Sequence, residues 1–126
     1  RDFARFGYLY LNQGHWDGKQ LLPKRWVDRS TTFKTRGRKT YAYLWWNKRY
    51  KYPVPADTYA ARGKGGQRLT VIPSLDIVAI RVGDEFKQNK TAWDYQFLKR
   101  ITEAVKAVIP AKKKPVKKAL HSKPAE

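Results

Sequence analysis

The stretch that decides the fold is residues 67–82, QRLTVIPSLDIVAIRV. It holds two runs rich in β-branched side chains, which a short segment with Pro, Ser and Asp at residues 73–76 separates. Side chains branched at Cβ favour extended backbone, whereas Pro and Asp favour turns. The stretch therefore predicts an antiparallel hairpin, with Asp76 shaping its turn.

A helix is predicted after the hairpin, from about Thr91 to Ile109. Thr91 together with Asp94 resembles a capping box, and Pro110 marks the end of the helix. Because an apolar stripe on a helix needs an apolar partner, we expect this helix to pack on the hairpin. The stripe consists of Trp93, Phe97, Ile101, Val105 and Val108.

Two shorter helices are predicted before the hairpin. Apolar residues at three- and four-residue spacing indicate a helix over residues 2–13, which Gly14 is placed to end. A second helix is predicted over residues 24–30, with Trp26 and Val27 facing inward. An Asp-Gly pair between the two helices indicates a turn.

A loop and a strand are predicted between these helices and the hairpin. Residues 31–39 are polar and basic and contain a Gly, which indicates an exposed loop. Residues 41–46, YAYLWW, are rich in aromatic side chains and are predicted to be a strand buried on both faces. With the hairpin and the terminal helix, these elements predict an α+β fold, an antiparallel sheet with a C-terminal helix packed on it.

The chain carries a net charge of +18, and most of the excess lies in residues 1–52 and 111–126. Residues 111–126 consist mainly of Lys, Ala and Pro, so we expect a disordered basic tail after a domain segment over residues 1–110. A field of this sign attracts many anions, including nucleic acid, but it says nothing about the fold.

Several kinds of site are disfavoured by what the sequence lacks. Cysteine is absent, which excludes disulfides and thiolate metal ligands. His, Asp and Glu show no metal-ligand spacing, so neither a metal nor another cofactor is expected. We expect His15 at the surface and His121 solvated in the tail. The sequence also contains no apolar run long enough to span a membrane.

Seven short motifs follow one another along the chain, at residues 2–7, 9–14, 16–22, 26–27, 41–46, 63–67 and 71–78. This ordered set resembles the C-terminal portion of serine beta-lactamase-related and penicillin-binding-protein-like hydrolases, in their esterase-like branch. The resemblance extends from Asp2 to about the end of the last predicted helix. It implies the C-terminal part of a beta-lactamase/transpeptidase-like domain.

The resemblance also implies a mechanism of acyl transfer. In that family a Ser-x-x-Lys serine attacks a carbonyl, a Tyr-x-Asn motif assists proton transfer, and a Lys-Thr-Gly-type triad on a strand forms the opposite wall. The triad is matched by Lys64, Gly65 and Gly66, so Lys64 would supply positive potential and the glycines would let substrate approach the backbone. The Gln67 backbone N–H would be one oxyanion-hole donor. Gly65 in place of Thr removes a hydroxyl that could bond a substrate carboxylate, so an ester, amide or peptidoglycan-like substrate is at least as compatible with the motif as a beta-lactam.

The nucleophile motif itself is absent from this sequence. Its serines are Ser30, Ser74 and Ser122, and none is followed by Lys three residues later. Residues 10–12 spell Tyr-x-Asn, but they fall inside the first predicted helix, where the family carries a structural segment. The sequence opens on Arg1 and contains no Met. We therefore expect a fragment, inactive by itself, of a serine hydrolase whose nucleophile lies upstream. The family resemblance implies a periplasmic or secreted location.

Three other interpretations remain open from the sequence. Residues 64–66 are compatible with an ordinary turn or an anion-binding nest, which would be preferred without the flanking motifs. The charge is compatible with a nucleic-acid or polyanion-binding module, although the aromatic residues fall at core spacings and no recognised nucleic-acid-binding motif occurs. The chain is also compatible with a non-catalytic homologue that serves as a binding scaffold.

Overall fold

The hairpin predicted from the sequence is present in the computed structural model, which describes residues 1–32, 40–47, 54–83 and 90–108. Its strands are β5 (Arg68–Ile72) and β6 (Ile77–Arg81), which pair antiparallel along their whole length. A short 3-10 turn joins them, and Asp76 follows it with a left-handed φ of 58°. Asp76 therefore shapes the turn as predicted, since Asp tolerates this conformation better than most residues.

Within the described residues, the hairpin belongs to a four-stranded antiparallel sheet in the order β3-β4-β5-β6. Strand β4 (Tyr59–Arg62) pairs with β5, and the two-residue strand β3 (Trp46–Asn47) pairs with β4. Asp57, just before β4, fixes the turn of the hairpin. Its carboxylate accepts hydrogen bonds from the backbone N–H of Ser74 at 2.6 Å and from the Ser74 hydroxyl at 2.9 Å.

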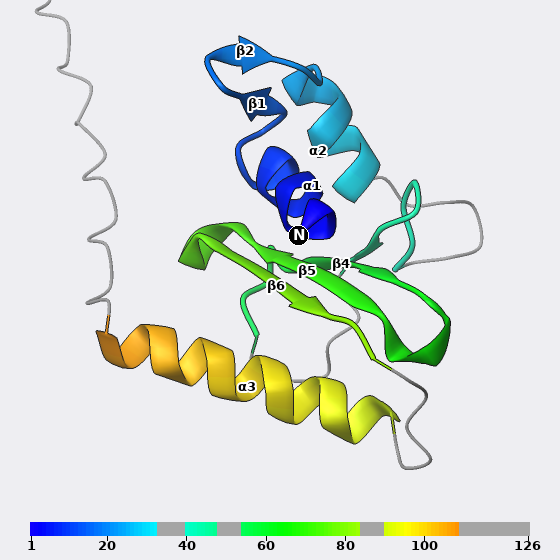
Figure 1. Cartoon of the computed structure of the whole chain (residues 1–126), viewed down its shortest axis with the longest axis vertical. Helices are drawn as coiled ribbons and strands as arrows, with labels where there is room; N and C mark the ends of the chain where they lie inside the picture. Colours follow the sequence, from blue (N-terminus) through cyan, green and yellow to red (C-terminus); the bar gives the residue numbers. More distant parts are fainter. Residues whose placement is uncertain (33–39, 48–53, 84–89, 109–126) are drawn as a thin grey trace, which may run out of the picture.

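Helices cover both faces of this sheet (Figure 1). Helices α1 (Asp2–Leu11) and α2 (Lys24–Thr32) lie on one face, with a small hairpin of β1 (His15–Trp16) and β2 (Lys19–Gln20) between them in sequence. Helix α3 (Lys90–Val108) runs along the other face. Each helix matches a predicted one to within two residues at either end. The fold is therefore α+β, as the sequence predicts.

Helix α1 lies very close to the hairpin because its buried residue Gly7 has no side chain. A Cβ atom at Gly7 would stand 2.6 Å from Val78 Cγ1 and 2.7 Å from Leu69 Cδ1. These distances are far below a normal carbon contact of about 3.5–4.0 Å. The missing side chain thus sets how closely the helix and the sheet pack.

An aromatic core fills the space between α1, α2 and the sheet. The ring of Trp45 lies 4.8 Å from that of Tyr10 and 5.0 Å from that of Tyr59, measured between centroids. Leu69 and Val71 complete it from the hairpin. Alternate residues on the opposite face of the sheet are also buried, as are two positions of α3: Ala60, Thr70, Ile72, Ala79, Leu98 and Thr102.

The predicted strand over residues 41–46 is wrong for most of its length. The backbone N–H of Ala42 donates to the Trp45 carbonyl at 2.8 Å, and Leu44 has a positive φ of 66°, so the chain reverses here. Only Trp46 continues into β3. Aromatic residues usually favour strands. In this segment the turn is favoured instead, because it places the Trp45 side chain in the core.

One inward-facing prediction fails, and another holds only in part. Trp26 is 40% exposed and packs its ring 5.5 Å from that of Tyr43, while Val27 is buried as predicted. Among the α3 side chains that the structure describes, Leu98 and Thr102 are buried, the stripe residues Phe97, Ile101 and Val105 are half-buried, and Val108 is 79% exposed. The side chain of Trp93 lies outside the described residues. The last turn of α3 extends beyond the sheet (Figure 1).

Residues 31 and 32 of the predicted loop belong to α2 instead, and Thr31 is buried with its hydroxyl donating to the Val27 carbonyl at 2.8 Å. The remainder of that loop, residues 33–39, lies outside the described residues. The predicted tail over residues 111–126 also lies outside them.

The close packing at Gly7 predicts that Gly7→Ala destabilises the protein. Helix propensity alone would make the variant about 1 kcal/mol more stable, but overpacking a close contact costs about 1–3 kcal/mol. We expect a net loss of about 1 kcal/mol in urea unfolding. Gly83→Ala is the control, because a Cβ at Gly83 meets no atom within 4 Å. A Gly7→Ala protein more stable than the wild type would contradict the packing argument.

Candidate functional site

The glycine-rich motif forms a turn, not a strand. Residues Lys64–Gly66 make a 3-10 turn between β4 and β5, in which Gly65 and Gly66 have φ values of 70° and 80°. Such positive φ angles favour glycine and cannot occur in an extended strand. The predicted strand conformation is therefore wrong at these residues, and the alternative of a turn describes their backbone correctly.

Besides its positive φ angle, the close approach of Arg81 is a second reason why residue 66 must be glycine. A Cβ atom at Gly66 would lie 2.3 Å from Nη1 of Arg81. That same Nη1 donates a hydrogen bond to the Gly66 carbonyl oxygen. Strand β6 thus holds the glycine turn in place through one guanidinium group.

Gln67 binds the turn to the end of β6. Its side-chain Nε2 donates to the Gly83 carbonyl at 2.7 Å, and its Oε1 accepts from the Gly83 N–H at 3.3 Å. Its own backbone N–H points to the Lys64 carbonyl oxygen at 3.5 Å, the long limit of a hydrogen bond. The sequence pointed to the backbone N–H of Gln67 as an oxyanion-hole donor, but nothing in it indicated that the side chain bonds to Gly83.

Three arginines lie directly opposite one another on neighbouring strands. The register pairs Arg62 with Arg68 across β4 and β5, and Arg68 with Arg81 across β5 and β6. Like charges at such positions repel, and each arginine makes contacts that offset this. Nη1 of Arg68 donates to the Gln67 carbonyl at 2.9 Å, and the guanidinium of Arg62 lies 5.7 Å from the centre of the Trp46 ring.

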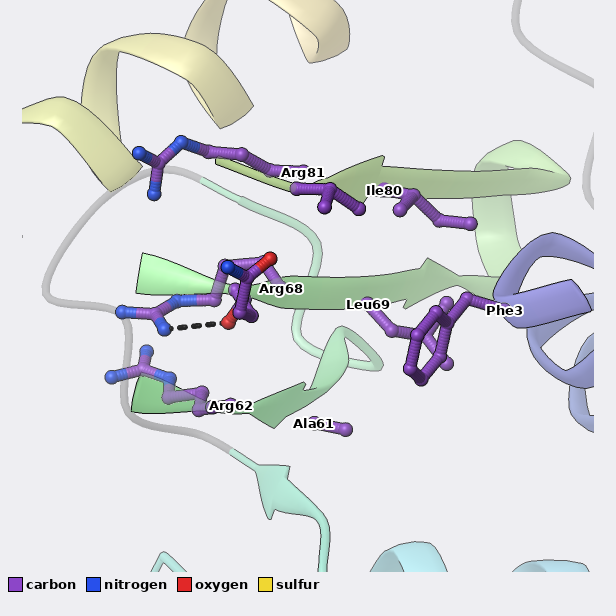
Figure 2. Close-up of a pocket in the computed structure, with 10 residues that line it drawn as sticks. Phe3, Ala61, Arg62, Arg68, Leu69, Ile80 and Arg81 are labelled. Carbon is purple, nitrogen blue, oxygen red and sulfur yellow. Dashed lines mark hydrogen bonds between the residues drawn. The ribbon is translucent and has the colours of Figure 1, made fainter. Parts of the chain in front are cut away.

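A cavity of about 480 Å³ lies next to the glycine turn. Figure 2 shows Phe3 of α1 in front of Leu69, while the three arginine side chains extend from the same end of their strands. Apolar residues and arginine stems line this cavity together with the turn's flanking residues Gly63 and Gln67. Such an arrangement suits a molecule that has an apolar part and polar groups. The sequence alone did not indicate this cavity, because its lining residues are far apart in the sequence and the pairing of the strands brings them together.

The other residues that sequence analysis considered for chemistry have structural surroundings. Tyr10 is buried in the aromatic core, and the Asn12 side chain donates to the Tyr8 carbonyl at 3.0 Å. Ser30 is buried and its hydroxyl donates to the Val27 carbonyl at 3.1 Å. His15 is exposed, and residue 121 lies outside the described residues.

The part of the chain that the structure describes contains no helix long and apolar enough to cross a membrane. In the same part, His, Asp and Glu side chains form no group of three or more that could hold a metal ion.

Comparison with known proteins gives a structural likeness only. No family model and no curated protein matches the chain. A solved structure from Bacillus anthracis, provisionally assigned as a 6-aminohexanoate-dimer hydrolase, matches with a TM-score of 0.64 and 23% sequence identity. The match covers 86% of this chain and 28% of that chain, so this chain spans well under half the length of its neighbour. The likeness shows that the fold is beta-lactamase-like over these residues.

The geometry of the turn predicts a larger loss for Gly66→Ala than for Gly18→Ala. Both glycines have positive φ, but a Cβ at Gly18 meets nothing within 4 Å. Gly18→Ala therefore measures backbone strain alone, about 1–2 kcal/mol, whereas Gly66→Ala must also displace the Arg81 guanidinium, at a further cost of about 1 kcal/mol. Urea unfolding of both variants measures the difference. Equal losses would show that the Arg81 contact is unimportant.

Proposed function

We propose that this chain is the C-terminal part of a serine hydrolase of the beta-lactamase-related, esterase-like type. The parent protein would act through an acyl-enzyme on an ester, amide or peptide-like substrate, with its nucleophile outside these 126 residues. The observation that carries the proposal is the glycine turn beside an apolar cavity, on a beta-lactamase-like fold.

Lys64 is the cation that we assign to this site. It is exposed at the tip of the turn, and Gly63 on its N-terminal side lines the cavity. A cation at this place would stabilise the negative charge that develops on the carbonyl oxygen during acyl transfer. Gly65 would leave the backbone open to the substrate because it has no side chain, whereas the space beside the buried Gly66 is taken by the Arg81 guanidinium.

Gln67 is the residue that we propose as oxyanion donor. Its backbone N–H is 3.5 Å from the Lys64 carbonyl oxygen, so the hydrogen bond inside the turn is weak. The two hydrogen bonds between its side chain and the Gly83 backbone hold Gln67 in a fixed position. Fixed donors are effective in catalysis since they need no reorganisation when charge develops.

The surface around the cavity supports the proposal that further protein covers it. Phe3 and Val82, which both line the cavity, are 65% and 73% exposed. Among the described strands, β6 pairs on one side only, with β5. Open sheet edges and clustered apolar residues are typical of surfaces that another segment covers. We propose that the segment with the Ser-x-x-Lys motif packs here.

The proposal predicts that Lys64→Ala lowers the activity of the longer polypeptide encoded by the same reading frame. With p-nitrophenyl butyrate as substrate, kcat/KM should fall about 10-fold to 100-fold, because one source of oxyanion stabilisation is lost. Lys19→Ala is the matched control, an exposed lysine in β2, which contributes no residue to the cavity lining, whereas Lys64 directly follows the lining residue Gly63. The 126-residue chain by itself should give no acylation burst.

Two results would refute the proposal. One is a Lys64→Ala enzyme as active as Lys19→Ala, which would remove the glycine turn from the site. The other is an acylation burst from the isolated chain, which would place a nucleophile within the sequence described above.

A further inference from the structure

A second cavity, of about 310 Å³, lies at the opposite end of β4 from the glycine turn. Residues from the end of α1, from α2, from β3 and from the start of β4 line it. Most residues that line this cavity carry polar side chains, although apolar atoms still make up the larger part of its exposed surface. The residues important here are Gln13, Asp28, Asp57, Thr58 and Tyr59.

Three oxygen atoms of this lining are buried without a hydrogen-bond partner. They are Oε1 of Gln13, Oγ1 of Thr58 and the hydroxyl of Tyr59. Thr58 and Tyr59 are only 2% and 6% exposed, so bulk water does not satisfy them. A buried polar atom without a partner is costly. A group bound at this cavity would supply the missing partners.

The electrostatic surroundings favour a positively charged group. The carboxylates of Asp28 and Asp57 belong to the lining, although few acids occur in this strongly basic chain. Burial, together with Tyr10, Asp57 and Asp28, raises the pKa of Tyr59 well above its ordinary value. Tyr59 therefore keeps its proton and offers a neutral oxygen. The net charge of the whole chain is screened beyond about 8 Å at physiological ionic strength, so the nearby acids dominate.

We propose that this cavity binds a small organic cation through a primary ammonium group. An ammonium carries three N–H donors and no acceptor, and an amide oxygen and two hydroxyl oxygens can accept three hydrogen bonds. Asp28 and Asp57 supply the balancing negative charge. A carboxylate ligand is disfavoured, since these acids would repel it. This site does not depend on the proposed hydrolase function.

The test measures binding of n-butylammonium chloride to the full chain by nuclear magnetic resonance. Two matched probes separate charge from hydrogen bonding: n-butanol is neutral, and n-butyltrimethylammonium is a cation without N–H donors. We expect saturable shifts at the amides of Asn47, Thr58 and Tyr59 with n-butylammonium. The two other probes should bind at least about tenfold more weakly, because charge-assisted hydrogen bonds are the stronger class.

Two isosteric variants test the buried hydroxyls. Thr58→Val and Tyr59→Phe should each weaken n-butylammonium binding about fivefold to tenfold. The unfolding midpoint of the free protein should stay the same or rise, because an unsatisfied buried group has been removed. Asp28→Asn gives a further check at an exposed position of α2, and it should weaken binding without changing the spectrum elsewhere.

Other outcomes would overturn the proposal. Equal binding of all three probes would show an apolar or purely ionic site. An absence of saturable shifts, or variants that bind as the wild type does, would show that the cavity holds only water.

Discussion

The contact of Gly7 with the β5–β6 hairpin sets how closely α1 lies on the sheet, and residues at or just after the two ends of α1 line both cavities. The helix can lie directly on Leu69 and Val78 because no side chain separates them. At its N-terminal end, Phe3 then reaches the cavity beside the glycine turn. Just after its C-terminal end, Gln13 reaches the polar cavity at the start of β4. One close packing contact thus places a residue in each candidate site.

Charge is distributed very differently around these two cavities. Three arginines surround the first, at the end of the strands where β4 turns into β5. Two aspartates lie at the second, where one of them also fixes the hairpin turn through Ser74. A chain with a large net positive charge therefore still has one cavity lined by arginines and another lined by aspartates. The net charge alone would not have indicated the second of these.

The sequence predicted elements whose local pattern and tertiary packing agree. The hairpin and the helices follow from β-branched runs, helical spacing and turn residues, and Asp76 adopts the conformation that its turn position requires. The aromatic segment around Leu44 failed because burial of Trp45 favours a turn over the strand that composition predicts. The glycine motif failed in the same way, since Gly66 is fixed by Arg81 from a distant strand. Neither cavity could be predicted from the sequence. The residues that line each cavity come together only through the pairing of the strands and through the short distance between α1 and the sheet.

The central claim is that the glycine turn is one wall of an acyl-transfer site whose nucleophile comes from another part of the protein. Mass spectrometry after reaction with a p-nitrophenyl ester tests it most directly, applied to the longer polypeptide and to the 126-residue chain. We predict one acyl group on a serine outside the present sequence in the longer polypeptide, and none on the chain alone. Acylation of Ser30, Ser74 or Ser122, or no acylation of the longer polypeptide, would contradict the account.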